Sequence, residues 1–401
     1  INEQLDNTTG SPVVVTYVVV STANGCSNTG ENVTVTVQPV PVVNVVSNQT
    51  LCNGSTTAAV TFTGVATQYN WTNDTPSIGL AGSGTGNIAG FTALNTGTSP
   101  VVATVTVTPI YTGCSGSTTS FTITVNPTPV LTSTLTPSAI CSGTSFSYTP
   151  TSATAGTTYA WTRAAVVGIS QAAGSGTGVI NETLTNTTVL PLSVVYNIVS
   201  TANSCSNAGQ NVVVTVYPTP VLSSTLSASA ICSGTSFSYT PTSATTGTTF
   251  AWTRAAVGGI SPATGSGSGN ISEALSSSNT TPTVVTYVVV STANGCSNTG
   301  ENVTVTVQPV PVVNVVSNQT LCNGSTTSAV TFTGVATQYN WTNDTPSIGL
   351  ASSGTGNIAG FTALNTGTSP VTGTITITPV YNGCTGSTTT FTITVNPTPV
   401  L

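Results

Sequence analysis

The sequence lacks methionine, lysine and histidine entirely, and arginine occurs only at Arg163 and Arg254. Charged side chains make up 2% of its 401 residues, whereas about 25% is usual for a globular protein. Without a basic patch to neutralise phosphate groups, we expect no binding to nucleic acid or to an anionic membrane surface. Because Ile1 stands where a translated chain has Met, we expect a processed product or a segment of a longer protein.

The missing residue types also argue against enzymatic chemistry. Serine and threonine are plentiful, but without histidine or lysine they have no general base to make them nucleophiles. Carboxylates, which a glycosidase pairs and a calcium site clusters, are spread thinly along the chain. They are Glu3, Asp6, Glu31, Asp74, Glu182, Glu273, Glu301 and Asp344. We therefore expect no catalytic residue, no metal and no cofactor.

Apolar residues are present, and they alternate with polar ones. Val and Ile occupy every second position of segments such as 33–37 and 121–125, with Thr between them, which is the period of a strand with one buried face. No window has a sustained helical period. The longest apolar run, 13–20, is interrupted by Thr16 and is shorter than the roughly 20 residues that a membrane helix needs. The sequence predicts an all-β fold without membrane insertion.

Internal repeats divide the chain. Residues 14–101 recur at 284–371 with two differences, and residues 127–217 recur at 218–308 in related form. A short Pro-x-Pro segment begins each unit and favours an extended, semi-rigid joint. We distinguish a shorter type A repeat from a longer type B repeat. The predicted domains are 1–38 (the last part of a type B repeat), 39–126 (type A), 127–217 and 218–308 (type B), and 309–401 (type A plus the next linker).

Each repeat is predicted to form a small β-sandwich. In residues 127–217 we expect strands near 145–149, 158–163, 180–184, 193–200 and 211–217, and one or two weaker ones. Roughly seven short strands in about 90 residues is typical of an immunoglobulin-like fold. One tryptophan per repeat lies where the third strand is expected, and we interpret it as a core anchor in preference to a sugar-stacking platform. These residues are Trp71, Trp161, Trp252 and Trp341.

Several motifs together resemble a known family. Ile-Cys-Ser-Gly at 140–143, Ala-Trp-Thr at 160–162, and the segment from Tyr17 through Ser-Thr-Ala-Asn-Gly-Cys at 21–26 are similar to the PKD-like repeats of Bacteroidetes surface proteins. The resemblance covers the whole chain. It implies tandem Ig-like sandwiches in a linear, elongated array, an extracellular or cell-surface location, and membership of gliding-motility adhesins, many of which leave through the type IX secretion system.

Nine cysteines fall into two series. One series precedes the second expected strand (Cys52, Cys141, Cys232, Cys322), and the other lies in the hairpin before the last strand (Cys26, Cys114, Cys205, Cys296, Cys384). In an exported protein without Cys-x-x-Cys or histidine, disulfides are favoured over metal binding. By analogy with antibody domains, the pairs form within a repeat: Cys52–Cys114, Cys141–Cys205, Cys232–Cys296 and Cys322–Cys384.

A second pairing joins neighbouring repeats. Five strands separate the two cysteines of one repeat, which places them at opposite ends of the sandwich, roughly 20 Å apart for a six-residue strand. A disulfide needs Cα atoms within about 7 Å. In a head-to-tail stack the facing ends instead give Cys52–Cys205, Cys141–Cys296 and Cys232–Cys384. Both pairings stay open at the level of the sequence, and the second is favoured.

Each of the two arginines has a glutamate at the same sequence distance. Arg163 and Glu182 are 19 residues apart, as are Arg254 and Glu273, and type A repeats lack both partners. We expect a structural ion pair inside each type B repeat, worth less than about 1 kcal/mol if it is exposed.

The predicted function is a structural stalk or filament segment of a very large secreted or surface adhesin. The expected partners are further copies of the repeat in cis, with lateral self-association through edge strands as a further possibility. The alternative is an accessory or carbohydrate-binding region of a secreted multidomain enzyme.

Overall fold

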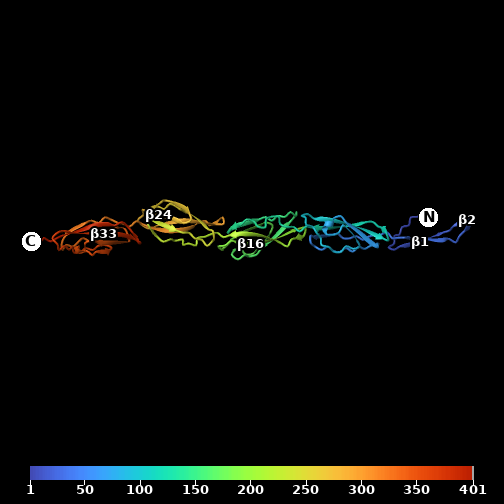
Figure 1. Ribbon diagram of the computed structural model, residues 1–401, viewed down its shortest axis with the longest axis horizontal. Helices are drawn as coiled ribbons and strands as arrows, with labels where there is room; N and C mark the ends of the chain where they lie inside the picture. Colours follow the sequence, from blue (N-terminus) through green and yellow to red (C-terminus); the bar gives the residue numbers. More distant parts are fainter. Residues whose placement is uncertain (400–401) are drawn as a thin grey trace. The chain divides into compact units, whose positions relative to one another are not determined.

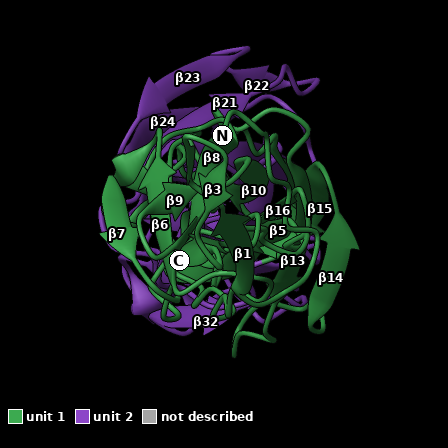
Figure 2. Ribbon diagram, turned by 90° about the vertical axis from the view of Figure 1, so that its right-hand side faces the viewer, with its two compact units in different colours: residues 1–185, 192–216 green, residues 186–191, 217–401 purple. Residues whose placement is uncertain are grey.

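The computed structural model describes residues 1–399. Its residues form two compact units, one of residues 1–185 and 192–216 and the other of residues 186–191 and 217–401 (Figure 2). The first unit holds the half-repeat 1–38 and the repeats 39–126 and 127–217. The second holds the repeats 218–308 and 309–396. Apart from residues 186–191, the division falls after residue 216, one residue before the predicted boundary between repeats.

Strands dominate both units, and the described residues include no α-helix, only two single turns of 3-10 helix (Figure 1). The half-repeat contains β1 (Val13–Val19), β2 (Thr22–Ala23), β3 (Cys26–Ser27) and β4 (Glu31–Val37). The first type A repeat contains β5 (Gln49–Cys52), β6 (Gln68–Asn73), η1 (Pro76–Ile78), β7 (Ser83–Thr85), β8 (Val101–Tyr111), β9 (Cys114–Ser115) and β10 (Thr119–Asn126).

The two type B repeats follow. The first has β11 (Ile140–Cys141), β12 (Thr144–Tyr148), β13 (Thr158–Arg163), β14 (Gly174–Thr177), β15 (Ile180–Leu184), β16 (Leu192–Ala202), β17 (Cys205–Ser206) and β18 (Gln210–Tyr217). The second has β19 (Ile231–Cys232), β20 (Thr235–Tyr239), β21 (Thr249–Arg254), β22 (Ile260–Ser261), β23 (Gly265–Ser268), β24 (Ile271–Ser277), β25 (Thr283–Ala293), β26 (Cys296–Ser297) and β27 (Glu301–Gln308).

The last type A repeat repeats the pattern of the first. It contains β28 (Val312–Val313), β29 (Gln319–Cys322), β30 (Gly334–Val335), β31 (Gln338–Asn343), η2 (Pro346–Ile348), β32 (Ser353–Thr355), β33 (Val371–Tyr381), β34 (Cys384–Thr385) and β35 (Thr389–Asn396). The predicted fold class, all-β with tandem Ig-like sandwiches, is confirmed. Every complete repeat has one six-stranded sheet; a small second sheet faces it in the type B repeats, and isolated bridges such as Val60↔Ile88 take its place in the first type A repeat.

The larger layer of each complete repeat is one sheet built around the long strand that precedes the hairpin. In residues 127–217 its order is β11-β18-β16-β13-β14, and β12 pairs with β15 in the facing layer. The first short strand joins the last one in parallel, as β5 with β10 and β19 with β27. This parallel pair brings the first cysteine of a repeat to the end of its last strand, because Cys52 stands beside Asn126 and Cys232 beside Gln308.

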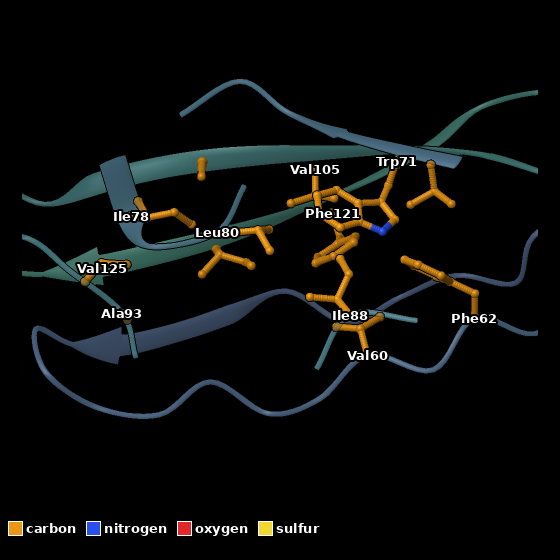
Figure 3. Packing of buried hydrophobic residues seen from close by; sticks show 13 residues of the cluster. Val60, Phe62, Trp71, Ile78, Leu80, Ile88, Ala93, Val105, Phe121 and Val125 are labelled. Carbon is orange, nitrogen blue, oxygen red and sulfur yellow. The ribbon is translucent and has the colours of Figure 1, made fainter. Parts of the chain in front are cut away.

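The core of each repeat lies between the two layers. Along β16 every second residue is buried, which places Val194, Tyr196 and Ile198 against the facing sheet. The corresponding core of the first type A repeat gathers around Trp71, with Val105 and Phe121 from the large sheet and Phe62 from the facing segments (Figure 3). The alternation read in the sequence is therefore the alternation of core and surface.

Candidate functional site

The cysteines lie at the ends of the repeats. Cys52 ends β5, and Cys205 begins β17, the short return strand of a hairpin in the following repeat. The structure joins them in a disulfide with an S–S distance of 2.01 Å and a Cα–Cα distance of 5.6 Å, across 153 residues of sequence. A hydrogen bond from Asn126 Nδ2 to the carbonyl oxygen of Asn203, 3.3 Å long, lies at the same junction. Both the covalent bond and the polar contact therefore connect repeat 39–126 to repeat 127–217.

The second unit has the same kind of junction. Cys232, at the end of β19, forms a disulfide with Cys384 in β34, with an S–S distance of 2.03 Å and a Cα–Cα distance of 5.5 Å. Asn382 in the same hairpin donates a hydrogen bond from Nδ2 to Gln308 Oε1 over 3.4 Å. The predicted pair Cys141–Cys296 has one cysteine in each compact unit, and it stays a prediction.

Pairing within a repeat is wrong. Cys52 bonds to Cys205 and not to Cys114, which is an exposed free thiol, as are Cys26 and Cys322. Cys232 bonds to Cys384, which leaves neither of them for a partner in its own repeat. The alternative pairs Cys52–Cys114, Cys141–Cys205, Cys232–Cys296 and Cys322–Cys384 are all excluded. The physical reason is the strand count, because the two cysteines of one repeat belong to opposite ends of the sandwich.

A tight hairpin presents each second-series cysteine. Asn203 and Ser204 both have positive φ, 49° and 63°, between β16 and β17. Two consecutive residues with positive φ form the two-residue turn that suits the twist of a hairpin, and Asn-Gly is its usual sequence. Asn294 and Gly295 occupy the same turn in the next repeat. The turn is Asn-Gly at three of the five hairpins, Asn203-Ser204 and Thr112-Gly113 form it at the other two, and in each case the cysteine stands just past the tip.

The Pro-x-Pro linker is packed against this hairpin. Both prolines of each internal linker are buried and the residue between them is exposed or half-buried. At Gly386, two residues after Cys384, an added Cβ would lie 1.9 Å from the carbonyl oxygen of Pro311, and Gly116 stands in the same relation to Pro41. Only glycine tolerates so close an approach of two backbones. The linker is therefore a fitted part of the repeat that follows it.

The predicted ion pairs are present; the arginine of each pair is buried and the glutamate is half-buried. Arg163 in β13 donates from Nε to Glu182 Oε2 over 2.8 Å and from Nη2 to Glu182 Oε1 over 3.1 Å, with 1% of the arginine side chain exposed. The Arg254–Glu273 pair has the same two contacts at 2.9 and 3.3 Å. Because these side chains bridge the two layers of the sandwich, the expectation of a weak surface pair does not apply to them.

A tyrosine completes each pair and was not foreseen from the sequence. The hydroxyl of Tyr196 donates to Glu182 Oε2 over 2.6 Å, and that of Tyr287 donates to Glu273 Oε2 over 2.7 Å. Both tyrosines follow their glutamate by 14 residues, whereas a type A repeat has Val105 at this place on the sheet. That difference between repeat types is the signal that could have identified them.

These contacts shift the pKa values of the acids. The hydrogen bond from Arg163 lowers the pKa of Glu182, although its burial opposes the effect. Burial alone would raise the pKa of Glu273, but the hydrogen bonds from Arg254 and Tyr287 outweigh it and the pKa is lowered. Burial and the neighbouring carboxylates raise the pKa of Tyr196 and Tyr287. Each triad therefore holds one charged pair and one neutral phenol, which is a structural arrangement.

The four tryptophans lie in the cores, with 7–8% of each residue exposed. A glycine on the neighbouring strand faces each ring. Trp71 is paired with Gly84 across β6 and β7, and a Cβ at Gly84 would lie 2.2 Å from the ring. The same holds for Trp161 and Gly176. A ring covered in this way offers no face for a sugar to stack on, so Trp71, Trp161, Trp252 and Trp341 act as core residues.

Among residues 1–399, no group of three His, Cys, Asp or Glu side chains is placed to hold a metal ion. Within the same range, no helix is long and apolar enough to cross a membrane.

Comparison with known proteins agrees with the fold. A family model described as PKD-like domain matches residues 138–220 and 229–311, which cover the two type B repeats. No curated protein matches the sequence. Tandem PKD-like repeats joined by disulfides are typical of extracellular adhesion-type or structural proteins.

Solved structures with a similar fold are themselves tandem arrays. The I-band fragment I67–I69 of titin is 13% identical, covering 68% of this chain and 99% of that fragment, with a TM-score of 0.35. Sidekick-1 immunoglobulin domains 1–5 are 11% identical, covering 99% of this chain and 98% of that one, with a TM-score of 0.26. The protocadherin GammaB4 extracellular domain is 13% identical, covering 99% and 74%, with a TM-score of 0.27. With TM-scores below 0.5, these similarities carry no further statement about this chain.

Proposed function

We propose that this chain is a load-bearing stalk segment of a very large secreted or surface adhesin. The observation that supports the proposal best is the disulfide between neighbouring repeats, as in Cys52–Cys205. Because this bond joins the first strand of one repeat to the last hairpin of the next, a pulling force crosses the junction through a covalent bond before any sandwich has to unfold. The buried prolines of the linkers add stiffness at the same place.

Two disulfides also limit how far the chain can be stretched. Cys52–Cys205 and Cys232–Cys384 bridge sequence separations of 153 and 152, and the residues between the bonded cysteines cannot extend under force while the bonds are closed. At about 3.5 Å per extended residue, reduction releases on the order of 1,000 Å of additional chain.

Single-molecule force spectroscopy tests the proposal. The chain is pulled from its two ends, first oxidised and then with dithiothreitol. We expect the fully extended length to grow by on the order of 1,000 Å after reduction. A matched variant with Cys52→Ser, Cys141→Ser and Cys232→Ser, which removes one cysteine of each observed or predicted disulfide between repeats, should show the longer length without reductant. An oxidised chain that already reaches the longer length contradicts the load-bearing role.

We further propose that the repeats form a linear, elongated array. At roughly 35–40 Å per repeat, four and a half repeats span on the order of 160 Å. Small-angle X-ray scattering in solution measures this length directly. A maximum dimension near that of a compact 401-residue globule, roughly 2.6 times a radius of gyration of about 21 Å, contradicts the array.

The location and the organism belong to the same proposal. The PKD-like match and the disulfides support an exported protein, and we propose a Bacteroidetes cell surface reached through the type IX secretion system. Antibodies against the chain should label intact cells, and the labelling should disappear in a strain that lacks this secretion system. Labelling that persists in such a strain contradicts the route while leaving the stalk role to the force measurement.

A further inference from the structure

Val315 is the most exposed large apolar residue of the last type A repeat. It is 93% exposed and lies between β28, which pairs with β30, and β29, which pairs with β35 of the large sheet. We call residues 315–317, where the chain passes from one sheet to the other, the crossover. The first type A repeat has the same sequence at 41–50 as this one at 311–320, and its Val45 is 90% exposed. The exposure is therefore a property of the type A repeat.

The main chain of the crossover makes no hydrogen bonds. Within residues 1–399, nothing bonds to the amide or carbonyl groups of Val315, Val316 or Ser317. A groove of about 410 Å³ lies between this segment and residues 328–331. Exposed main chain without hydrogen bonds is where proteases cut a folded protein, whereas a strand inside a sheet is protected. The peptide bond between Val315 and Val316 is therefore open to attack.

The chain is held on both sides of the crossover. Before it, Asn314 donates from its amide to the carbonyl oxygen of Thr333 over 2.8 Å and from Nδ2 to Thr333 Oγ1 over 2.9 Å. After it, Asn318 Oδ1 accepts the amide of Thr392 over 2.8 Å, and β29 pairs with β35. The two flanks are bound to different strands, so a break between them removes no hydrogen bond.

A disulfide also encloses the crossover. Val315 lies between Cys232 and Cys384 in the sequence, and these two cysteines are bonded to each other. After a cut at Val315, the parts of the chain before and after it stay joined through this bond. The new carboxylate and amine arise next to the exposed residues Asn314 and Ser317, where water solvates them.

We propose that the Val315–Val316 bond is a cleavage site for proteases that accept a small aliphatic residue before the cut, and that repeat 309–396 stays folded after it. Hydrolysis consumes one water, which leaves a carboxylate on Val315 and an amine on Val316. Trypsin-type proteases find no such site, because the chain has no lysine and Arg163 and Arg254 are each 2% exposed. The consequence, which rests on the stalk proposed above, is that a stalk cut here still transmits force.

The first test treats the full chain, with its disulfides intact, with pancreatic elastase. Mass spectrometry of aliquots that are reduced after quenching identifies the new amino termini over time. We expect a terminus at Val316 to appear before any terminus inside β31, β33 or β35. A first cut inside one of these strands overturns the assignment.

The second test makes the cut unique. In a Val315→Arg variant, trypsin has one exposed arginine to cut at, since the native arginines are buried. The matched control is Thr372→Arg, which also places arginine at an exposed position, but in β33, where Thr372 pairs with Thr394 of β35. We expect the first variant to be cut at least roughly tenfold faster than the second. Equal rates overturn the proposal.

The chain cut at residue 315 shows whether the repeat survives. Hydrogen exchange in β31 and β35, measured by mass spectrometry, should change by less than roughly twofold on cutting. Electrophoresis without reductant should give one band, which separates into residues 1–315 and 316–401 on reduction. In a variant that also carries Cys232→Ser and Cys384→Ser, the two fragments should separate without reductant.

The outcomes distinguish this inference from the stalk. A larger rise of exchange in β31 and β35 overturns the tolerance of the cut, and it leaves the stalk to the force measurement on the uncut chain. Fragments that separate without reductant, although Cys232 and Cys384 are both present, contradict the disulfide and with it the stalk.

Discussion

At the residue scale, both arginines of the chain belong to Arg–Glu–Tyr triads inside the type B repeats. Arg163 and Glu182 connect β13 of the large sheet to β15 of the facing one, and Tyr196 adds a hydrogen bond to Glu182 from β16, the neighbour of β13 in the large sheet. A buried pair is weak evidence of net stabilisation, but removing one partner leaves an uncompensated buried charge. The triad is therefore a place where single substitutions have large effects.

We predict that Arg163→Met destabilises repeat 127–217 by roughly 3 kcal/mol, because Glu182 loses its counter-charge inside the sandwich. Hydrogen exchange by mass spectrometry, read separately on β13 and β15, measures the loss. Glu301→Gln is the matched control, since Gln210 already performs the task of Glu301 in the preceding repeat by accepting the amide of Leu131 over 2.7 Å. A control that loses as much protection as the arginine variant contradicts the assignment.

Acid should weaken the type B repeats through the same residues. The pKa of Glu182 and of Glu273 is lowered in the folded state from an ordinary value of 4.5. A lowered folded-state pKa gives stability that is fully present above the unfolded value and is lost as the pH falls through the folded value. We expect the melting temperature to fall below about pH 4.5.

The comparison that isolates this effect is the double variant Glu182→Gln and Glu273→Gln, measured by calorimetry between pH 6 and pH 2. Its melting temperature should be lower than that of the native chain at pH 6 and should change less on acidification. An unchanged pH dependence would assign acid sensitivity to other groups, such as Asp74, whose pKa is lowered by a hydrogen bond from the amide of Thr104.

At the element scale, the β33–β34 hairpin packs closely against the Pro-x-Pro linker that begins its repeat. The backbone contact between Gly386 and Pro311 fixes β34 relative to the linker, and β34 carries Cys384. We predict that Gly386→Ala reduces the fraction of chains that form Cys232–Cys384 on oxidative refolding, because the added methyl group pushes the hairpin away from its partner. Thr385→Ala, at the exposed neighbouring position, should leave that fraction unchanged. Non-reducing peptide mapping quantifies both variants.

The elements were largely predictable from local patterns. The expected strands 158–163 and 180–184 coincide with β13 and β15, and 145–149 and 211–217 differ by one residue from β12 and β18. An alternation of apolar and polar residues is a local pattern, so a strand can be predicted from it without knowledge of the rest of the chain. The glycine opposite each tryptophan was not predicted, since which residues face each other across two strands depends on register.

At the scale of the whole molecule, cysteine pairing decides how the repeats are joined. We predict that Cys141 and Cys296 form a third disulfide between repeats, in addition to Cys52–Cys205 and Cys232–Cys384. Peptide mapping without reduction should yield a Cys141–Cys296 cross-link. A cross-link between Cys141 and Cys205 would contradict both this pair and the arrangement at Cys52.

By itself, the sequence predicted the repeat boundaries and determined the all-β class, the absence of a helical period and the spacing of Arg163 from Glu182. These features are local or are visible by comparing one repeat with another. Only the tertiary structure decided between the two cysteine pairings, showed that Tyr196 bonds to the ion pair, and showed that a glycine covers the ring of each tryptophan. The reason is that each of these depends on which strands and repeat ends contact each other in three dimensions. Contacts between residues more than 150 positions apart leave no local pattern in the sequence.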